Sequence, residues 1–494
     1  MSVAFEELRS RLADINALKA AASMMEWDQQ TYMPPGGAEA RSEHLGRLSK
    51  MAHELFTSDE TLQLIEEAKP GAEGDDADML RVVSRDAYLA TKLPTELVEE
   101  KSRLAAVAHE EWVRARANND FKGFAPTLAR MFEIAAQEAD LLGYKTERYD
   151  ALLDLYEEGS TAADARAMFD AIKGPQVELV HAIAQQPEVD DSILYGEWPV
   201  SSQKAFTEHL VQSIGFDMER GRQDVAPHPF CSGWSRGDIR LTTRYKPYLP
   251  SAIFGSLHEA GHGMYEQGTP EKWDLTPLAG GVSLGVHESQ SRTWENLVGR
   301  SLAFWEYFMP ELHKHFPSLR GLDARAFYRL VNKVEPSFIR VEADELTYNL
   351  HVMVRFELES DILNGKLAVK DLPEAWNAKY TEYLGITPST DSEGCLQDVH
   401  WSMGSIGYFP TYSFGNLLSY QIWTALEKDL GDTQELIRAG NFRPILDWLL
   451  EKIYSKARQM KPKELVLSVT GKPMDPEDYL RGLGSKYRNL YGLG

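Results

Sequence analysis

Two histidines spaced four residues apart, with a glutamate directly after the first, suggest a metal-binding helix. His258, Glu259 and His262 lie in the run Ser256-Leu257-His258-Glu259-Ala260-Gly261-His262. Residues four apart are neighbours on a helix, so both imidazoles can direct a ring nitrogen at one ion. Glu259 projects about a quarter-turn away and can reach a metal-bound water without being a ligand. The pattern predicts a hydrolytic metal site with Glu259 as general base.

A third ligand is required, because a catalytic zinc is held by three protein ligands and keeps one position open. Glu288 is the best candidate, since it follows the glycine-containing segment 280–285 and begins a helical run that could pack beside the first helix. Glu295 on the same run is the serious alternative. Glu266 lies on the helix of the two histidines, and Asp274 falls in the connecting loop.

The elements around this motif have recognisable boundaries. Pro250 and Ser251 indicate a helix start and Gly268 a helix stop. Apolar and polar residues alternate over 239–245, which predicts a strand shortly before the helix. We therefore expect one small sheet beside the metal-binding helix.

Helical periodicity dominates the rest of the chain. Apolar residues recur at steps of three and four, or bounded helical runs occur, in the segments 5–15, 124–134, 346–358, 417–430 and 444–454. No repeat, low-complexity tract or long linker separates two units. The sequence predicts a mainly α fold, one catalytic domain over residues 1–494, in which residues 1–100 could form a helical lid.

Composition excludes several classes of function. Fifty-two Lys and Arg against 75 Asp and Glu give a formal charge of -23, which disfavours nucleic acid as a partner. No apolar run approaches the ~18 residues that a membrane span needs. Only Cys231 and Cys395 are present, and we find no secretory signal. A cytoplasmic protein without nucleic-acid or membrane partners is expected.

Several further motifs extend over most of the chain, in order. They are His228-Pro229-Phe230, Asp238-Ile239-Arg240-Leu241-Thr242, His287-Glu288-Ser289-Gln290, Ile339-Arg340-Val341-Glu342-Ala343-Asp344, Gly394-Cys395-Leu396-Gln397-Asp398-Val399-His400-Trp401, and an amino-terminal Trp27-Asp28 followed by Tyr32-Met33-Pro34. Together with the histidine helix they resemble the carboxypeptidase Taq family of metallocarboxypeptidases.

That resemblance implies a helical protein with a deep groove, a homodimer, and removal of single residues from the carboxyl termini of peptides. It also implies Glu288, and not Glu295, as the third ligand. The expected ion is Zn²⁺, with Co²⁺ or Mn²⁺ as possible substitutes, because three nitrogen and oxygen ligands accept several such ions.

Hydrolysis would also need a donor for the oxyanion that develops opposite the metal. Tyr408 and Tyr412 are candidates, as is His400. Packing in the core is an equally good interpretation of each tyrosine by itself.

A carboxypeptidase must recognise a free carboxylate, which a planar guanidinium binds through two hydrogen bonds. Arg340 is the first choice and Arg240 the second, although Arg340 could instead pair with Glu342 or Asp344. His228 is a candidate for lining the groove, since it precedes a proline in a loop.

The residues that orient the metal-binding histidines are less clear. Arg292 stands four residues after Glu288, where other zinc peptidases have an aspartate that orients a histidine. We expect that carboxylate to come from elsewhere, with Asp344 or Asp238 as guesses. His287 should point away from the ion and line the pocket or support a ligand.

Two other functions remain open at this point. A zinc oligoendopeptidase or peptidyl-dipeptidase would share the helix motif and differ in how the groove ends. A binding protein stabilised by a structural metal is the non-enzymatic alternative, but such a site closes all four positions with ligands and has no use for Glu259.

Overall fold

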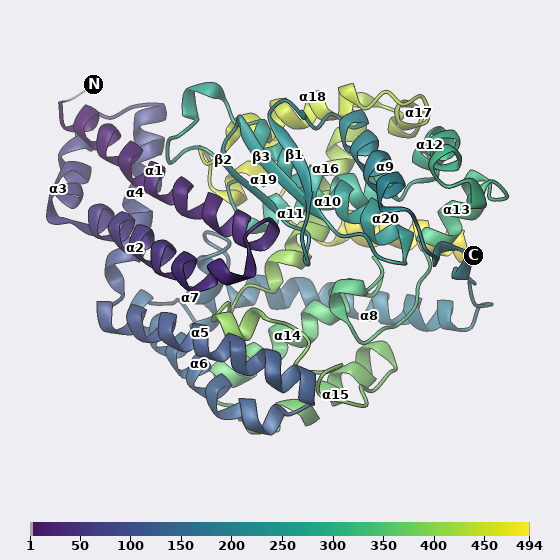
Figure 1. Ribbon diagram of the computed structural model, residues 1–494, viewed down its shortest axis with the longest axis horizontal. Coiled ribbons are helices and arrows are strands. Elements are labelled where there is room, and N and C mark those ends of the chain that lie inside the picture. The colour runs from purple at the N-terminus through teal and green to yellow at the C-terminus, as the bar shows by residue number, and fades with distance from the viewer. Residues whose placement is uncertain (1–2, 494) are drawn as a thin grey trace.

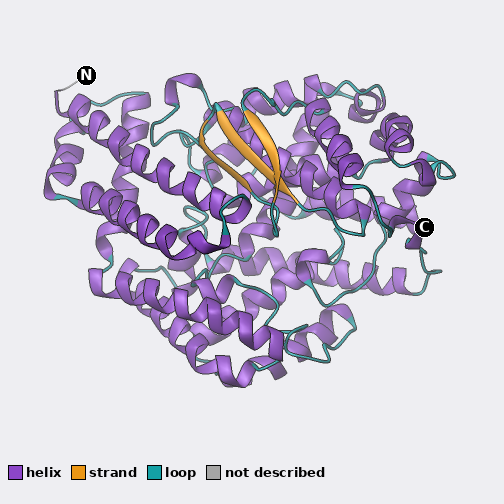
Figure 2. Cartoon of the chain, in the orientation of Figure 1, coloured by secondary structure: helices purple, strands orange, loops and turns teal. Residues whose placement is uncertain are grey.

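The computed structural model describes residues 3–493. As predicted, it is a mainly helical domain with one three-stranded sheet (Figures 1 and 2). In the described part, no helix combines the length and the apolar character that crossing a membrane would require.

The amino-terminal helices form a layer with its own apolar core. They are α1 (Val3–Thr31), α2 (Ala38–Thr57), α3 (Asp59–Ala68) and α4 (Asp75–Lys92). The apolar stripe predicted in α1 is buried there, through Phe5, Leu8, Leu12 and Ile15. In Figure 1 this layer lies at the left, and α1 also contacts the edge strand of the sheet.

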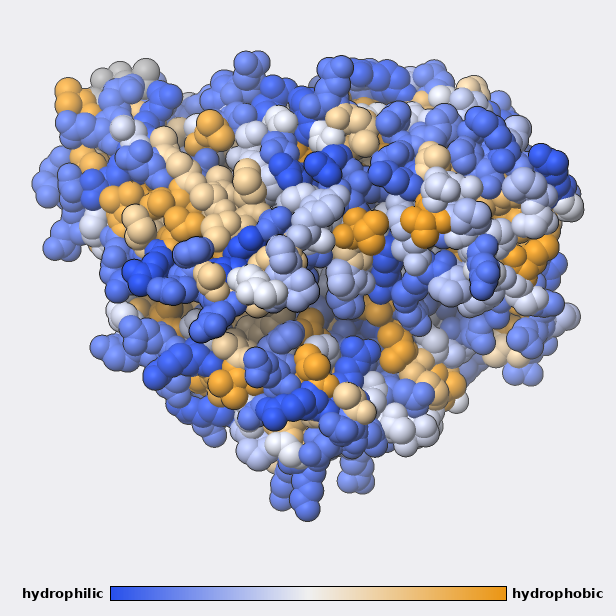
Figure 3. Space-filling model, in the orientation of Figure 1, coloured by the Kyte–Doolittle hydropathy of each residue, from blue (hydrophilic) through white to orange (hydrophobic). Residues whose placement is uncertain are grey.

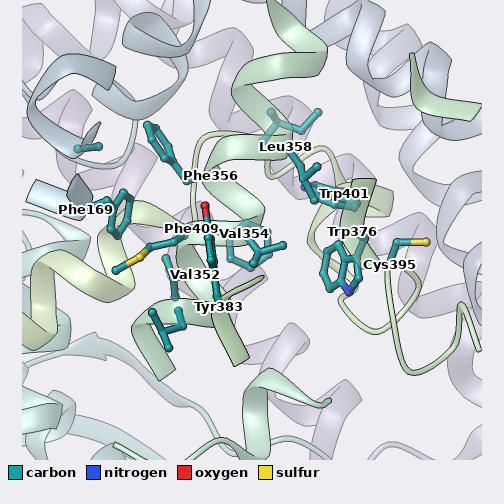
Figure 4. Packing of buried hydrophobic residues seen from close by; sticks show 14 of the residues in the cluster. Phe169, Val352, Val354, Phe356, Leu358, Trp376, Tyr383, Cys395, Trp401 and Phe409 are labelled. Carbon is teal, nitrogen blue, oxygen red and sulfur yellow. The ribbon is translucent and has the colours of Figure 1, made fainter. Parts of the chain in front are cut away.

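A second group of helices forms the lower part of Figure 1. It comprises α5 (Thr95–Asn118), α6 (Phe121–Leu142), α7 (Arg148–Asp154), α8 (Ala162–Ala184), α14 (Tyr348–Leu363) and α15 (Leu372–Leu384). Helix α14 runs through the middle of this core, where Val352, Val354 and Phe356 pack among aromatic side chains (Figure 4). Its periodicity was predicted, and it is buried on nearly all sides, so its buried charged residues Arg355 and Glu359 need partners within the protein.

The sheet has the strand order β1-β3-β2. β1 (Gly221–Val225) pairs parallel to β3 (Asp238–Thr243), and β2 (Cys231–Ser235) pairs antiparallel to it. β3 confirms the predicted strand, which ends two residues earlier than expected. Ile239 and Leu241 belong to the same apolar core as the inner residues of α10, so the sheet packs on that helix.

Three helices meet at the predicted metal site: α10 (Leu249–Gln267), α11 (Leu284–Arg292) and α16 (Pro410–Leu430). Helix α11 continues into a π-helical turn over Thr293–Gly299. Two glycines permit the close packing. A Cβ at Gly261 would lie 2.6 Å from the Gln290 carbonyl oxygen, and a Cβ at Gly415 would lie 2.4 Å from the side chain of Glu288.

The remaining helices pack around these three. They are α9 (Val200–Ser213), α12 (Leu302–His315), α13 (Ala324–Val331), α17 (Thr433–Arg438), α18 (Arg443–Lys452), α19 (Pro462–Thr470) and α20 (Glu477–Tyr491). The space-filling view is mostly hydrophilic and hollowed across its middle, between the upper and lower parts of the molecule (Figure 3).

Candidate metal centre and the groove around it

His258, His262 and Glu288 converge on one point. Their ligand atoms form the one such cluster found in the described residues, all within 4.8 Å of one another. Glu288 Oε2 lies 3.5 Å from His258 Nε2 and 3.4 Å from His262 Nε2. Zinc–ligand bonds of about 2.0–2.1 Å in a tetrahedron separate ligand atoms by about 3.3 Å. The three side chains therefore fit a tetrahedral zinc ion.

His258 is oriented by a carboxylate. Its Nδ1 lies 2.9 Å from Glu295 Oε2, which leaves Nε2 to face the metal position. Arg292 and Arg300 in turn donate to Glu295, at 3.2 and 3.3 Å. Burial alone would raise the pKa of Glu295, but Arg292, His258 and Arg300 lower it to about 2. Glu295 is thus an anion that supports His258.

His262 is oriented differently, by a second histidine. Its Nδ1 lies 2.6 Å from His287 Nδ1, and His287 Nε2 lies 2.7 Å from Glu266 Oε1. If His262 Nε2 faces the metal, Nδ1 carries the proton and donates it to His287 Nδ1. His287 must then be protonated on Nε2 and donate to Glu266. One assignment of tautomers to His262 and His287 therefore satisfies both hydrogen bonds in this series.

These contacts correct the expectation about the supporting carboxylates. Asp344 accepts hydrogen bonds from Leu346 and Thr347 at the start of α14. Asp238 pairs with Arg240. Neither is among the contacts of the metal-binding histidines, and Glu295 and Glu266 have that role because α10 packs beside α11 and its π-helical continuation.

Glu288 is held as firmly as the histidines. Arg292 Nε donates to its Oε1 at 2.7 Å, and Ser291 Oγ donates to its Oε2 at 3.0 Å. Although burial opposes ionisation, Arg292 and the two histidines keep the pKa of Glu288 well below its usual range. Arg292 stands where other zinc peptidases have an aspartate. In this protein it supports Glu288 and Glu295 together.

Glu259 is a buried carboxylate without a fixed partner. It is 6% exposed, and no hydrogen bond or ion pair to its carboxylate is found among residues 3–493. Burial raises its pKa to about 7, with Glu288 and Glu295 adding to the rise and His258 opposing it. A carboxyl group with such a pKa can exchange a proton near neutral pH.

The predicted oxyanion donors form one cluster beside the metal site. The rings of Tyr408 and Tyr412 lie 5.2 Å apart, and His400 Nε2 lies 3.1 Å from the Tyr412 hydroxyl. Burial raises the pKa of Tyr408 to about 12, and Glu288 contributes to that rise. Burial, followed by the charge of Arg340, lowers the pKa of His400 to about 3. The tyrosines are hydroxyl donors and the imidazole is neutral.

Arg340 is a neighbour of this cluster, but its guanidinium is engaged. Nε and Nη2 donate to Asp398 Oδ1 at 3.0 and 2.7 Å, and Nη1 donates to the Tyr348 hydroxyl at 2.8 Å. The side chain is 4% exposed and stacks on the ring of Tyr412. The ion-pair interpretation named the wrong partners, because Arg340 pairs with Asp398, which lies far along the sequence.

The other two predicted substrate contacts lie farther from the metal ligands. Arg240 is stacked between Trp27 and Trp234, at 4.3 and 4.7 Å from the ring centroids, on the face of the sheet toward α1. His228 is exposed in the loop between β1 and β2. Among residues 3–493, no hydrogen bond or ion pair joins either side chain to His258, His262 or Glu288.

Sequence reasoning missed Arg355 altogether. It is fully buried on α14, and its Nε donates to Asp398 Oδ2 at 2.6 Å. Two arginines therefore share one aspartate beneath Tyr412. An arginine within the apolar run 352–356 was the available signal, since a buried charge needs a partner.

A helical fold with an H-E-x-x-H helix, a glutamate from the next helix and a buried free carboxylate defines the class of metal-dependent peptidases. A family model described as carboxypeptidase Taq (M32) metallopeptidase matches residues 7–487. The chain belongs to this family, so it is a metallocarboxypeptidase that removes carboxyl-terminal residues.

Individual relatives agree over nearly the full chain. Thermostable carboxypeptidase 1 of Thermus thermophilus is 40% identical, over 99% of this chain and 98% of the relative. The Pyrococcus furiosus protein of the same name is 39% identical, over 98% of each. The crystal structure of an M32 carboxypeptidase from Deinococcus radiodurans superposes with a TM-score of 0.97 at 37% identity, covering 99% of this chain and 100% of that one.

Family membership answers the questions that the sequence left open. The oligoendopeptidase, the peptidyl-dipeptidase and the non-catalytic binding protein are set aside in favour of a metallocarboxypeptidase with a His-His-Glu site. The finer assignments, including the identity of the metal and the roles of the groove residues, are proposals.

Proposed function

We propose that the protein is a zinc carboxypeptidase in which His258, His262 and Glu288 hold Zn²⁺ and Glu259 is the general base. The observation that carries the proposal is the distance of 3.4–3.5 Å from Glu288 Oε2 to Nε2 of each histidine, which matches the edge of a tetrahedral site. When bound, zinc supplies Lewis acidity toward the scissile carbonyl and toward water. Co²⁺ or Mn²⁺ could replace it in vitro.

Glu259 takes a proton from the attacking water and later delivers it to the leaving amine. Two features support this role: burial brings its pKa to about 7, and its carboxylate is free of the partners that fix Glu288 and Glu295. A carboxylate already bound to an arginine would be a much weaker base.

Tyr408 and Tyr412 donate hydrogen bonds to the oxyanion as it develops, and His400 holds the Tyr412 hydroxyl in place. Their raised pKa values keep both hydroxyls protonated at neutral pH. Arg340 positions this cluster through its stacking on Tyr412. His228, in the loop between β1 and β2, and Arg240, in β3, are the candidates for lining the groove.

Four further proposals complete the function. The peptide substrates have free carboxyl termini. The protein works as a homodimer in the cytoplasm, a compartment in which Cys231 and Cys395 would stay reduced, as both are free thiols. The amino-terminal layer, with residues 1–100, acts as a lid over the groove. Analytical ultracentrifugation tests the dimer, and cell fractionation tests the compartment.

The decisive experiment compares wild-type protein with Glu259→Gln. Both should bind one zinc per chain, measured by elemental analysis after dialysis. Mass spectrometry of a digested peptide should show single-residue shortening from the carboxyl terminus for wild type alone, with turnover reduced by about 10²–10⁴ in the variant. Equal turnover in both proteins would refute Glu259 as the base.

A further inference from the structure

Among the arginines of residues 3–493 that are at least partly buried, two lack an acidic partner. Every other such arginine lies within 4.0 Å of a carboxylate. Arg116 and Arg244 are partly buried and have none. With 75 acidic residues against 52 basic ones, partners are abundant. A partly buried, unpaired guanidinium in such a protein is therefore available to an anion from outside.

Arg244 lies close to the metal-binding helix. It directly follows β3, and Thr243 Oγ1 is 3.1 Å from Ser256 Oγ on α10. Ser256 precedes His258 by two residues, which is about 3 Å along the helix axis. The end of β3 is thus anchored within one turn of a metal ligand, and Arg244 follows it directly.

The same segment also reaches the tyrosine cluster. Lys246 pairs with Glu342 at 3.1 Å, so the chain just beyond Arg244 contacts the short turn Arg340–Glu342. Arg340 from that turn stacks on Tyr412. Arg244 is therefore flanked by the metal helix on one side and by the turn that supports Tyr412 on the other.

Arg116 approaches from the lower part of the molecule. It lies in the last turn of α5, which is anchored to the loop that leads to His400. Trp112 Nε1 donates to the Leu396 carbonyl at 2.8 Å, and Ser392 Oγ donates to the Arg116 carbonyl at 2.5 Å. The Arg116 guanidinium stacks on Trp112 and has no acidic partner of its own.

Both arginines come close to one imidazole, that of His228. Burial lowers the pKa of His228, and the charges of Arg244, Arg116 and Lys246 lower it further, in that order. The neighbourhood is therefore cationic, although the protein as a whole carries a formal charge of -23. It lies where the upper and lower parts of the molecule face each other.

We propose that Arg244, assisted by Arg116, binds the terminal carboxylate of the peptide substrate. The inference rests on the proposed carboxypeptidase function and names the group that provides its specificity for chain ends. A free guanidinium binds a carboxylate through two hydrogen bonds. Arg340 already donates three of its five N–H groups, to Asp398 and Tyr348, and its side chain is only 4% exposed. Arg340 is a positioning residue, and Arg244 contacts the substrate.

The test uses Glu259→Gln protein loaded with zinc, which binds peptide without consuming it. Binding of a fluorescent peptide with a free carboxyl terminus is compared with binding of its carboxyl-amidated form. The parent should prefer the acid by at least about tenfold, and addition of Arg244→Ala should abolish that preference while leaving the affinity for the amide unchanged. Arg244→Lys should restore part of it, and Arg116→Ala should reduce it less.

Steady-state kinetics of the single variants, with Glu259 intact, supply the second measurement. Arg244→Ala should lower kcat/KM for the free acid by about 100-fold, mainly through KM, because a ground-state contact is lost. The control is Arg325→Ala, which removes an exposed arginine on α13 that has no acidic partner. Arg325→Ala should have the same kcat/KM as wild type. Thermal unfolding and zinc content verify that each variant is folded and loaded.

The outcomes separate the inference from the function on which it rests. If Arg244→Ala keeps the preference for the acid, Arg244 is not the carboxylate ligand, although the enzyme can still be a carboxypeptidase. If the parent binds acid and amide equally, carboxylate recognition itself fails, and the inference fails with it.

Discussion

The metal half of the site and the aromatic wall beside it, formed by His400, Tyr408 and Tyr412 with the buried Arg340 and Arg355, treat buried charge in different ways. At the metal, Glu288 and Glu295 each accept hydrogen bonds or ion pairs from several donors, and the free nitrogen of each histidine is engaged. In the wall, Arg340 and Arg355 share the single carboxylate of Asp398. His400 Nδ1 and Arg355 Nη2 are buried there without a partner.

This difference shows what each half is organised to receive. A metal ion needs ligands fixed before it arrives, so every supporting contact is made within the protein. In the wall, two buried guanidinium groups share the carboxylate of Asp398, an arrangement that suits an anionic substrate.

Removing the charge of Asp398 should have the largest effect on the stability of the fold. In Asp398→Asn, two buried guanidinium groups lose their counter-charge, and the free energy of unfolding should fall by about 3–5 kcal/mol. Urea denaturation measures this free energy of unfolding. The control is Asp447→Asn, which removes an exposed partner of Arg443 and should change stability by less than about 1 kcal/mol. Equal losses of unfolding free energy in the two variants would mean that Asp398 does not stabilise the fold through Arg340 and Arg355.

The pH dependence of stability should also reflect the wall. Burial raises the pKa of Glu359 to about 7, and its partners Tyr149 and Trp401 oppose the rise. A carboxyl group with a raised folded pKa stabilises the fold below its unfolded pKa of about 4.5, and that contribution is lost as the pH rises through 7. The loss amounts to about 3 kcal/mol, at about 1.4 kcal/mol per pH unit.

Glu359→Gln cannot titrate, so its stability relative to wild type should increase between pH 5 and pH 8. Chemical denaturation at a series of pH values measures that difference. Parallel curves for the two proteins would show that Glu359 titrates alike in the folded and unfolded chains.

The junction between the two halves depends on Gly415. In Gly415→Ala the new methyl group would meet Glu288 at 2.4 Å, so stability should fall by about 1–3 kcal/mol and zinc should bind more weakly. Gly484→Ala on α20 is the matched control, since a Cβ there has open space. It should stabilise by about 0.4–1 kcal/mol. A neutral Gly415→Ala would mean that α11 and α16 can separate at little cost.

The contributions of Glu295, which orients His258, and His287, which orients His262, to metal affinity can be compared. Removal of a group that orients a ligand typically weakens metal binding by about 10–100-fold. Glu295→Ala also removes the partner of Arg292, so it should fall at the upper end of this range, and His287→Ala at the lower end. Competition with a chromophoric chelator measures both. Unchanged affinity in His287→Ala would show that His262 needs no support.

For the fold, the periodicity of α1, α14 and α16, the ends of α10 and the strand β3 were all predictable. Each depends on residues that are close in sequence. The order of the strands and the packing of α10, α11 and α16 were not, because packing depends on side chains that meet only after the chain has folded.

For the site, the sequence by itself determined the pair His258 and His262 and the base Glu259, because the pitch of one helix fixes their relation. It left Glu288 and Glu295 as rivals, which only the family resemblance separated. The tertiary structure decided that Glu295 holds His258, that His287 links His262 to Glu266, and that Asp398 engages Arg340. These pairs join different elements, and no local spacing encodes how such elements come together.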